Sequence, residues 1–306
     1  MRVLIIGLGS IAAKHILAIQ SINSSFEIFA LRNTLESKSF EGVINLYSIE
    51  NIEITFDFII ISNPTYLHGK SILEALKFNC PLFIEKPVLG NLNDVSILQK
   101  IIKQKNAITY IACNLRFHPL INFLKNYLPE RIPHINEINV YCGSYLPDWR
   151  PGIDFRKVYS ANADMGGGVH IDMIHELDYC IWLFGKPFEV RSLKRSASSL
   201  RINSIDFADF TLFYQNFVVN IQLNYFRRDT KRQIEIVTKD ETLVGDLISN
   251  KLTSLSEGKV LFHSDFKMSD TYYEQMKYFI TNIGKGEKNM NDFEEALSIL
   301  KIALNE

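Results

Sequence analysis

The sequence predicts an α/β protein in two parts. The first is a doubly wound parallel sheet, and the second is an α/β domain with a large, mostly antiparallel open sheet. Apolar strands alternate with helical apolar spacing up to about residue 118, and from about residue 135 strands dominate. We therefore expect domains over residues 1–118 and 119–306, with the C-terminal helices as candidates to pack back on the first domain.

The first part follows a regular strand–helix rhythm. Residues 57–62 are apolar almost throughout, which is typical of a strand buried on both faces of a parallel sheet. The alternation predicts a doubly wound arrangement that ends near residue 118. Strands are expected at 3–6, 26–31, 57–62, 81–84 and 107–113, and helices at 11–22, 68–78 and 91–105.

The second part contains strands of a different kind. Residues 218–225 alternate apolar and polar side chains, so one face of this sheet is buried and the other is wetter. Gln215 and Asn216 fit a hairpin turn after a strand at 210–214. Further strands are expected at 135–145 and 233–237, and two amphipathic helices within 272–305, separated at 284–286.

Composition excludes several function classes. The 306 residues are 47% hydrophobic and 22% charged, with a formal net charge of -1, which gives no electrostatic case for a nucleic-acid or membrane-surface partner. The four cysteines are scattered without metal-binding spacing, so no metal site is expected. No signal peptide or apolar run of membrane-spanning length is present, so we expect a cytoplasmic protein.

The first strand leads directly into a glycine motif, Gly7-Leu8-Gly9-Ser10-Ile11-Ala12. Gly7 permits a tight turn, Gly9 lets the backbone approach a pyrophosphate, and Ala12 keeps the helix close to the strand. Amide groups at the helix N-terminus then face the phosphate charge. The motif predicts a Rossmann dinucleotide-binding unit. Its candidate contacts are Gly7, Gly9, Ser10 and Ile11.

The end of the second strand indicates which dinucleotide is bound. An acidic residue there usually holds the ribose 2′-hydroxyl of NAD. Here Arg32 is followed by Asn33, and the first acid is Glu36. Because arginine pairs with phosphate and stacks on adenine, we expect NADP, with NAD as the close alternative.

Two further motifs end neighbouring strands. Glu85-Lys86-Pro87 follows one strand, and Ser62-Asn63-Pro64 with His68 follows another, at the sheet edge where doubly wound folds bind ligands. Together with the glycine motif, this pattern resembles the Gfo/Idh/MocA family of NAD(P)-dependent sugar and cyclitol oxidoreductases. The resemblance places Lys86 beside the nicotinamide and the reacting carbon. It implies further cofactor contacts at Ser62, Asn63, Pro64, His68 and Glu85.

The family's third block is similar to residues 166–178, three glycines followed by Asp172 and His175. In the family this helix supplies acid/base residues. The family usually separates its aspartate and histidine by four positions, whereas here they are three apart. Both spacings keep a pair on neighbouring positions of one helix. Asp172 is otherwise interpreted as a carboxylate at a helix N-terminus, and His170 as structural or at the rim of the site.

Hydride transfer at a carbinol carbon requires a group that takes or gives the hydroxyl proton. His175 suits this role because imidazole titrates near neutrality. Lys86 can stabilise developing alkoxide charge, or relay the proton itself if burial lowers its pKa. Asp172 would orient the substrate or the histidine. The sequence leaves the choice between lysine and histidine open.

An aromatic and basic loop, residues 144–160, precedes the glycine run. Its composition suits stacking on a sugar and binding an anionic group. The resemblance implies a sugar substrate. The motifs of this chain are similar to those of family members linked to bacterial surface-sugar and nonulosonate biosynthesis. The resemblance also implies a homo-oligomer (dimer or tetramer) formed through the C-terminal sheet. A redox-assisted lyase or hydrolase with recycled NAD, and a non-catalytic cofactor-binding regulator, are the alternatives. Candidate substrate contacts are Arg116, Tyr145, Trp149, Arg150 and Tyr159.

Overall fold

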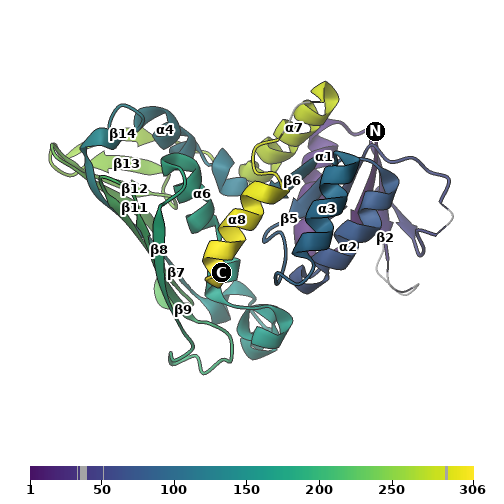
Figure 1. Cartoon of the computed structure of the whole chain (residues 1–306), viewed down its shortest axis with the longest axis horizontal. Helices are drawn as coiled ribbons and strands as arrows, with labels where there is room; N and C mark the ends of the chain where they lie inside the picture. Colours follow the sequence, from purple (N-terminus) through teal and green to yellow (C-terminus); the bar gives the residue numbers. More distant parts are fainter. Residues whose placement is uncertain (33, 35–39, 51, 287–288) are drawn as a thin grey trace. The chain divides into compact units, whose positions relative to one another are not determined.

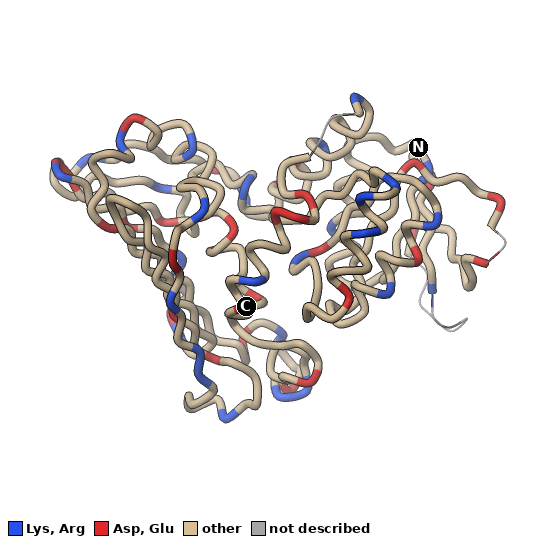
Figure 2. Tube along the Cα trace, viewed as in Figure 1, with Lys and Arg blue, Asp and Glu red and all other residues tan. Residues whose placement is uncertain are grey.

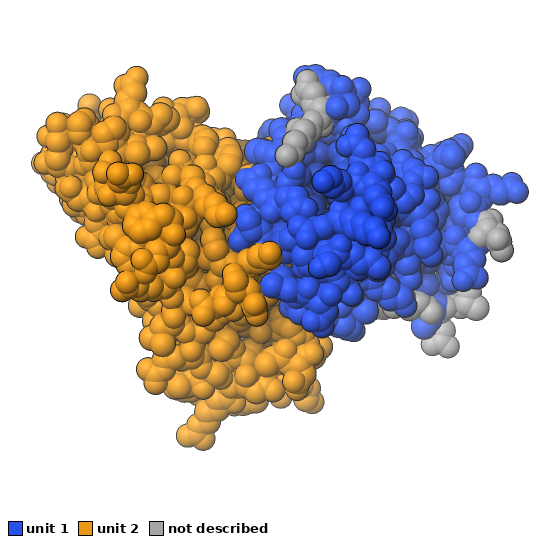
Figure 3. Space-filling model, in the orientation of Figure 1, with its two compact units in different colours: residues 1–114, 269–298 blue, residues 115–268, 299–306 orange. Residues whose placement is uncertain are grey.

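The structure is a computed structural model that describes residues 1–32, 34, 40–50, 52–286 and 289–306. The chain forms two compact units (Figure 3). Unit 1 comprises residues 1–114 and 269–298, and unit 2 comprises residues 115–268 and 299–306. Unit 1 thus stops short of residue 118 and takes in most of the C-terminal helical segment. None of the helices described is long and apolar enough to cross a membrane.

Unit 1 is built on a six-stranded parallel sheet with the order β3-β2-β1-β4-β5-β6 (Figure 1). The chain leaves β1 toward one edge of the sheet and later returns to β4, on the other side of β1. Ligands bind in such sheets outside the carboxyl ends of the strands where the order reverses. The strands are β1 (Arg2–Ile6), β2 (Glu27–Leu31), β3 (Val43–Leu46), β4 (Phe58–Ile61), β5 (Leu82–Glu85) and β6 (Thr109–Ala112).

Helices cover this sheet, and an aromatic cluster fills one interface. Helices α1 and α7 contact each other, as do α2 and α3. Phe279 of α7 packs on Phe58 and on Phe83, with ring centroids 5.3 Å apart in each case. Gly286 ends α7 in the left-handed conformation, at φ +67°. The helices are α1 (Ser10–Ile22), α2 (His68–Ala75), α3 (Val95–Lys105), α7 (Asp270–Lys285) and α8 (Phe293–Leu304), whose residues are divided between the two units.

Unit 2 contains an eight-stranded sheet with the order β14-β13-β12-β11-β7-β10-β9-β8, in which β7 and β10 pair in parallel and the other pairs are antiparallel. One face is apolar: Val219, Ile221 and Leu223 of β10 are fully buried. The strands are β7 (Ile135–Tyr145), β8 (Glu189–Arg195), β9 (Phe207–Phe213), β10 (Val218–Asn224), β11 (Phe226–Thr238), β12 (Thr242–Asp246), β13 (Lys251–Ser254) and β14 (Lys259–His263).

The helices of unit 2 are α4 (Pro119–Tyr127), α5 (Val169–Asp172) and α6 (His175–Phe184). Helix α6 contacts both α4 and β10. A series of short 3-10 turns links β7 to α5 over residues 146–165. Lysine and arginine are interspersed with acidic residues along both units, consistent with the near-zero net charge (Figure 2).

The predicted fold class is confirmed, and the turn at Gln215-Asn216 closes the β9–β10 hairpin, with Tyr214 N–H donating to the Phe217 carbonyl. Five strands were not predicted: β3, β8 and β12 to β14. β3 is an edge strand whose side chains are half-buried or exposed, so it lacks a clear apolar pattern. The helix expected at 91–105 begins only at Val95.

Candidate active site

The glycine motif forms a turn in which the two glycines do different things. Gly7 has φ +96°, and a Cβ there would lie 2.3 Å from the Asn63 backbone nitrogen. Gly9 is the N-cap of α1, and a Cβ there would meet nothing within 4 Å. The first N–H groups of a helix have no partner within it. The open space over Gly9 therefore leaves room for a pyrophosphate, and the contact itself stays a prediction.

The loop after β4 supports this turn. Ser62 Oγ donates to the Gly7 carbonyl oxygen at 2.9 Å, and Asn63 Nδ2 donates to Ser71 Oγ at 2.7 Å. Ser62 thus gives its hydroxyl hydrogen to the glycine turn. Direct contacts of Ser62, Asn63 and Pro64 with a cofactor stay a prediction.

Arg32 lies just beyond β2, and its backbone N–H donates to the Leu46 carbonyl. Its guanidinium Nη1 is buried and has no hydrogen-bond partner among the described residues. A buried guanidinium nitrogen without an acceptor is costly, and an anion such as a ribose phosphate would satisfy it. Asn33 and Glu36, which entered the sequence argument, lie outside the described residues.

Lys86 follows the last residue of β5, and buried histidines contact both of its neighbours in sequence, Glu85 and Pro87. On one side, Glu85 Oε2 accepts the Lys86 backbone N–H at 3.2 Å, while Oε1 lies 2.6 Å from His15 Nε2. His15 comes from α1 and was not among the predicted site residues. The available signal was a histidine within the apolar stripe of that helix, since Ala12, Ile16 and Ile19 are buried with it.

On the other side, His68 Nδ1 lies 3.0 Å from the Pro87 carbonyl oxygen, and Nε2 lies 3.0 Å from the Asn63 carbonyl oxygen. His68 is 1% exposed, and burial lowers its pKa below the usual 6.5. It therefore ties the loop after β4 to the loop after β5. Glu85 and His68 both have protein partners, and their contacts with a cofactor stay a prediction.

In unit 2 the three glycines let the chain pass close to its own backbone. A Cβ at Gly167 would lie 2.0 Å from the Tyr159 carbonyl oxygen, and Gly166 and Gly168 have φ +78° and +141°. This close passage brings residues 159–162 against the segment that carries Asp172. Because only glycine fits, the run fixes the loop beside α5.

The structure corrects the expected relationship between Asp172 and His175, which do not share one continuous helix. Asp172 ends α5 and His175 begins α6, because Met173 leaves helical geometry at φ -99°, ψ 30°. His170 is buried, and desolvation lowers its pKa to about 4, in agreement with a structural interpretation.

Asp172 accepts two hydrogen bonds from tyrosines. The Tyr159 hydroxyl donates to Oδ1 at 2.6 Å, and the Tyr225 hydroxyl donates to Oδ2 at 2.5 Å. These distances are typical of O–H···O⁻ bonds to an ionised carboxylate. Burial, and then the charge of Asp172, raises the pKa of both phenols, so they remain protonated donors.

Residues of the aromatic loop contact both tyrosines that donate to Asp172. Trp149 packs edge-on against Tyr225 with centroids 5.3 Å apart, and its Nε1 donates to Ser144 Oγ at 2.9 Å. The Arg150 guanidinium lies 5.7 Å from the Tyr159 ring centroid. Unit 2 therefore brings together Asp172 and three predicted substrate contacts, Trp149, Arg150 and Tyr159. Tyr225 is an addition that the sequence did not single out.

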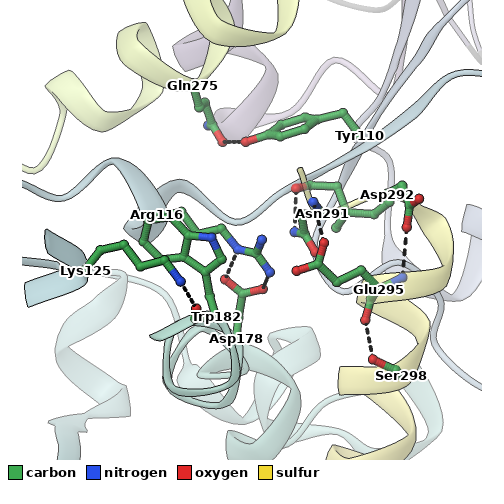
Figure 4. Close-up of polar contacts among 11 residues, drawn as sticks. Tyr110, Arg116, Lys125, Asp178, Trp182, Gln275, Asn291, Asp292, Glu295 and Ser298 are labelled. Atoms are coloured by element: carbon green, nitrogen blue, oxygen red, sulfur yellow. Dashed lines mark hydrogen bonds and ion pairs between the residues drawn. The ribbon is translucent and has the colours of Figure 1, made fainter. Parts of the chain in front are cut away.

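The other two predicted substrate contacts lie elsewhere in unit 2. Successive residues of a strand point to opposite faces, so Tyr145 faces away from Ser144. The Arg228 guanidinium stacks on the Tyr145 ring, with its Cζ 3.8 Å from the ring centroid. Arg116 is 1% exposed and donates from Nε and Nη2 to the Asp178 carboxylate at 2.9 and 2.8 Å (Figure 4). This buried pair ties the segment before α4 to α6, and we do not carry Arg116 into the proposed substrate site.

Residues 1–112 match the Gfo/Idh/MocA family, described as an oxidoreductase family with an NAD-binding Rossmann fold. Over 315 aligned residues the chain is 23% identical to the myo-inositol 2-dehydrogenase of Thermotoga maritima, covering 94% of this chain and 89% of that protein.

Solved structures of dehydrogenases share the fold at low sequence identity. A UDP-N-acetylglucosamine 3-dehydrogenase from Acidithiobacillus ferrooxidans superposes with a TM-score of 0.80 at 19% identity, covering 100% of this chain and 96% of that one. A dehydrogenase from Bordetella pertussis, in complex with NADH and UDP-GlcNAcA, gives a TM-score of 0.80 at 18% identity, with coverage of 99% and 93%. At these identities the solved structures show the shared fold.

Proposed function

We propose that this protein transfers a hydride between a nicotinamide dinucleotide and a CH–OH carbon of a sugar or sugar derivative. One observation carries the proposal: the open glycine turn at Gly9 and the lysine at Lys86 follow β1 and β5, which end at the same carboxyl edge of one parallel sheet. A pyrophosphate held at that turn leaves the nicotinamide end within the same edge of unit 1. Sugar dehydrogenases among the similar proteins support the substrate class.

Residue roles follow from what the chemistry needs. The cofactor supplies the redox step. We propose that Lys86 stabilises the charge that develops on the substrate oxygen, and that His175 gives or takes the hydroxyl proton. Asp172 holds Tyr159 and Tyr225, and this group with Trp149 and Arg150 is the proposed surface for the sugar.

We further propose NADP as the preferred cofactor, with NAD as the close alternative. The support is the buried Nη1 of Arg32, which has no acceptor among the described residues and sits just beyond β2, where dinucleotide-binding folds meet the adenosine ribose. A 2′-phosphate would provide that acceptor.

The test is a screen of sugars, cyclitols and nucleotide sugars with each oxidised and reduced cofactor, followed by the absorbance of the reduced nicotinamide. Stoichiometric cofactor turnover with at least one substrate is the expected result. Product formation without net cofactor change would instead identify a redox-assisted lyase or hydrolase. Tight cofactor binding without any product would favour a regulator.

A further inference from the structure

His15 takes no part in the proposed chemistry, although its position is unusual for a polar residue. It is 0% exposed, in the middle of the core-facing stripe of α1. Polar groups are buried at a cost that a hydrogen bond must offset. Among the described residues its hydrogen-bond partner is the Glu85 carboxylate, at 2.6 Å.

The geometry of the His15–Glu85 pair is fixed by neighbouring rings. Side chains alternate along β5, so Phe83 and Glu85 project from the same face, toward α1. The Phe83 ring packs against the imidazole with centroids 4.9 Å apart, and Tyr272 of α7 packs at 5.9 Å. Both contacts are edge-to-face. The imidazole is therefore held with Nε2 directed at the carboxylate.

The hydrogen-bond partners also assign the proton. His15 Nδ1 is buried without a partner among the described residues, so an imidazolium would carry an N–H with no acceptor. The arrangement fits Nε2–H as the donor and Glu85 Oε1 as the acceptor. One carboxylate oxygen is then occupied by His15, and the other receives the Lys86 backbone N–H at 3.2 Å.

We propose that His15 is a positioning residue for Lys86 and acts through Glu85. The inference rests on the proposed role of Lys86 in hydride transfer. The carboxylate, fixed by His15, holds the Glu85–Lys86 peptide and so sets the direction in which the lysine side chain leaves the end of β5. Without the imidazole donor, Glu85 Oε1 loses its partner at a side chain only 10% exposed. The carboxylate then turns toward water and releases the Lys86 N–H.

Two variants of His15 test this directly. His15→Leu removes the donor, whereas His15→Gln places an amide nitrogen near the position of Nε2. In His15→Leu, kcat falls by about tenfold to a hundredfold, a loss typical of a misplaced reacting group, while cofactor affinity stays within a few fold. His15→Gln recovers most of that loss. Leu17→Ala, an exposed change on the same helix, is the matched control.

A double-variant comparison separates positioning from folding. If His15 acts through Lys86, His15→Leu lowers kcat in the wild-type background and has little further effect in Lys86→Ala. A merely structural role would lower thermal stability in both backgrounds and leave kcat per folded enzyme unchanged. Equal kcat losses in both backgrounds, or no loss in His15→Leu, would overturn the inference while leaving the proposed function intact.

A measurement without turnover keeps the inference testable if no substrate is found. Reductive methylation with carbon-13 formaldehyde labels lysine amines, and the Lys86 resonance is identified by its absence in Lys86→Met. With cofactor bound, that resonance should shift or broaden in His15→Leu and remain at the wild-type position in His15→Gln and Leu17→Ala. An unchanged resonance in His15→Leu would contradict the positioning role. Failure of the proposed function alone would leave this result unaffected.

Discussion

The Tyr225 hydroxyl donates to Asp172 Oδ2 at 2.5 Å, joining the residue that follows β10 to the last residue of α5. With Tyr159 on the other oxygen, the carboxylate already accepts two strong hydrogen bonds. Asp172 is therefore suited to hold the aromatic surface rather than to exchange a proton. That leaves His175 and Lys86 as the candidates for proton transfer.

We expect His175→Asn to lower the rate, leave the cofactor bound, and flatten the near-neutral limb of the rate–pH profile, because asparagine keeps a hydrogen-bonding group but does not titrate. The measurement is kcat against pH for this variant and for Lys86→Met. If the limb survives in His175→Asn and disappears in Lys86→Met, the lysine is the acid/base and the assignment is reversed.

Lys86→Ala should reduce turnover by about a hundredfold or more, with cofactor affinity unchanged within a few fold, since the lysine acts on the reacting oxygen and not on the dinucleotide. Steady-state kinetics and cofactor titration by fluorescence measure the two quantities separately. Near-normal turnover would remove Lys86 from the mechanism and would also remove the basis for a positioning role of His15.

Arg32→Ala should weaken NADP more than NAD, because only NADP offers the 2′-phosphate. A lost charge-assisted contact is worth about 1.5–3 kcal/mol, equivalent to about tenfold to more than a hundredfold in affinity. Titration calorimetry with both dinucleotides makes the comparison. An equal loss for both would indicate stacking on adenine instead of phosphate recognition.

Acid should destabilise unit 2 through His118. This residue is 0% exposed, its Nε2 lies 3.1 Å from the Leu247 carbonyl, and Nδ1 has no partner among the described residues. Burial lowers the pKa of His118 to about 4, against 6.5 for the exposed group. The unfolded chain therefore binds the proton first, and stability present above pH 6.5 is lost as the pH falls toward about 4.

The loss for His118 is at most about 3.5 kcal/mol, from about 1.4 kcal/mol per unit of pKa difference. His118→Gln keeps a donor for Leu247 without a titrating ring, so its urea-unfolding free energy should fall less between neutral pH and pH 4.5. His263→Gln, at an exposed histidine, serves as the control. The same pH slope in His118→Gln and in the wild type would exclude His118 as the cause.

The protein should be a homo-oligomer, most simply a dimer, formed through the wetter face of the unit 2 sheet. Asn220 on that face donates to Asn139 Oδ1 at 3.1 Å, so its polar groups are largely satisfied across the strands and can be covered by a second copy. Light scattering at micromolar concentration should give twice the chain mass, and Gln222→Arg should shift it toward the monomer. A wild-type monomer would reject the prediction.

Local sequence patterns were sufficient to predict those features that a short motif determines. The glycine turn and the lysine after β5 lie where their motifs predict, because such motifs specify backbone geometry at the end of a strand. The β9–β10 hairpin was predicted because alternation and turn residues agree. These features depend on neighbours in sequence.

Partners distant in sequence could not be predicted. Nothing near Glu85 indicates that its carboxylate is bound by a histidine 70 positions earlier. Arg116 was predicted to contact substrate, but its guanidinium donates to Asp178, which lies 62 residues later in the chain. The break at Met173 was missed because the surrounding residues favour helix and only the backbone angles reveal it. A polar residue in the sequence indicates that its side chain needs a partner when it is buried, but it does not identify that partner.

Gly7 and Gly9, the two glycines of the first turn, are needed for different reasons. At Gly7 the added carbon collides with the protein's own backbone, whereas at Gly9 it enters open space at an ordinary φ of -102°. A genetic selection that scores only folding and abundance would reject changes at Gly7 and accept many at Gly9. A selection that scores growth on the enzyme's product would reject both. Comparing the two would separate residues retained for the chain from residues retained for its cofactor.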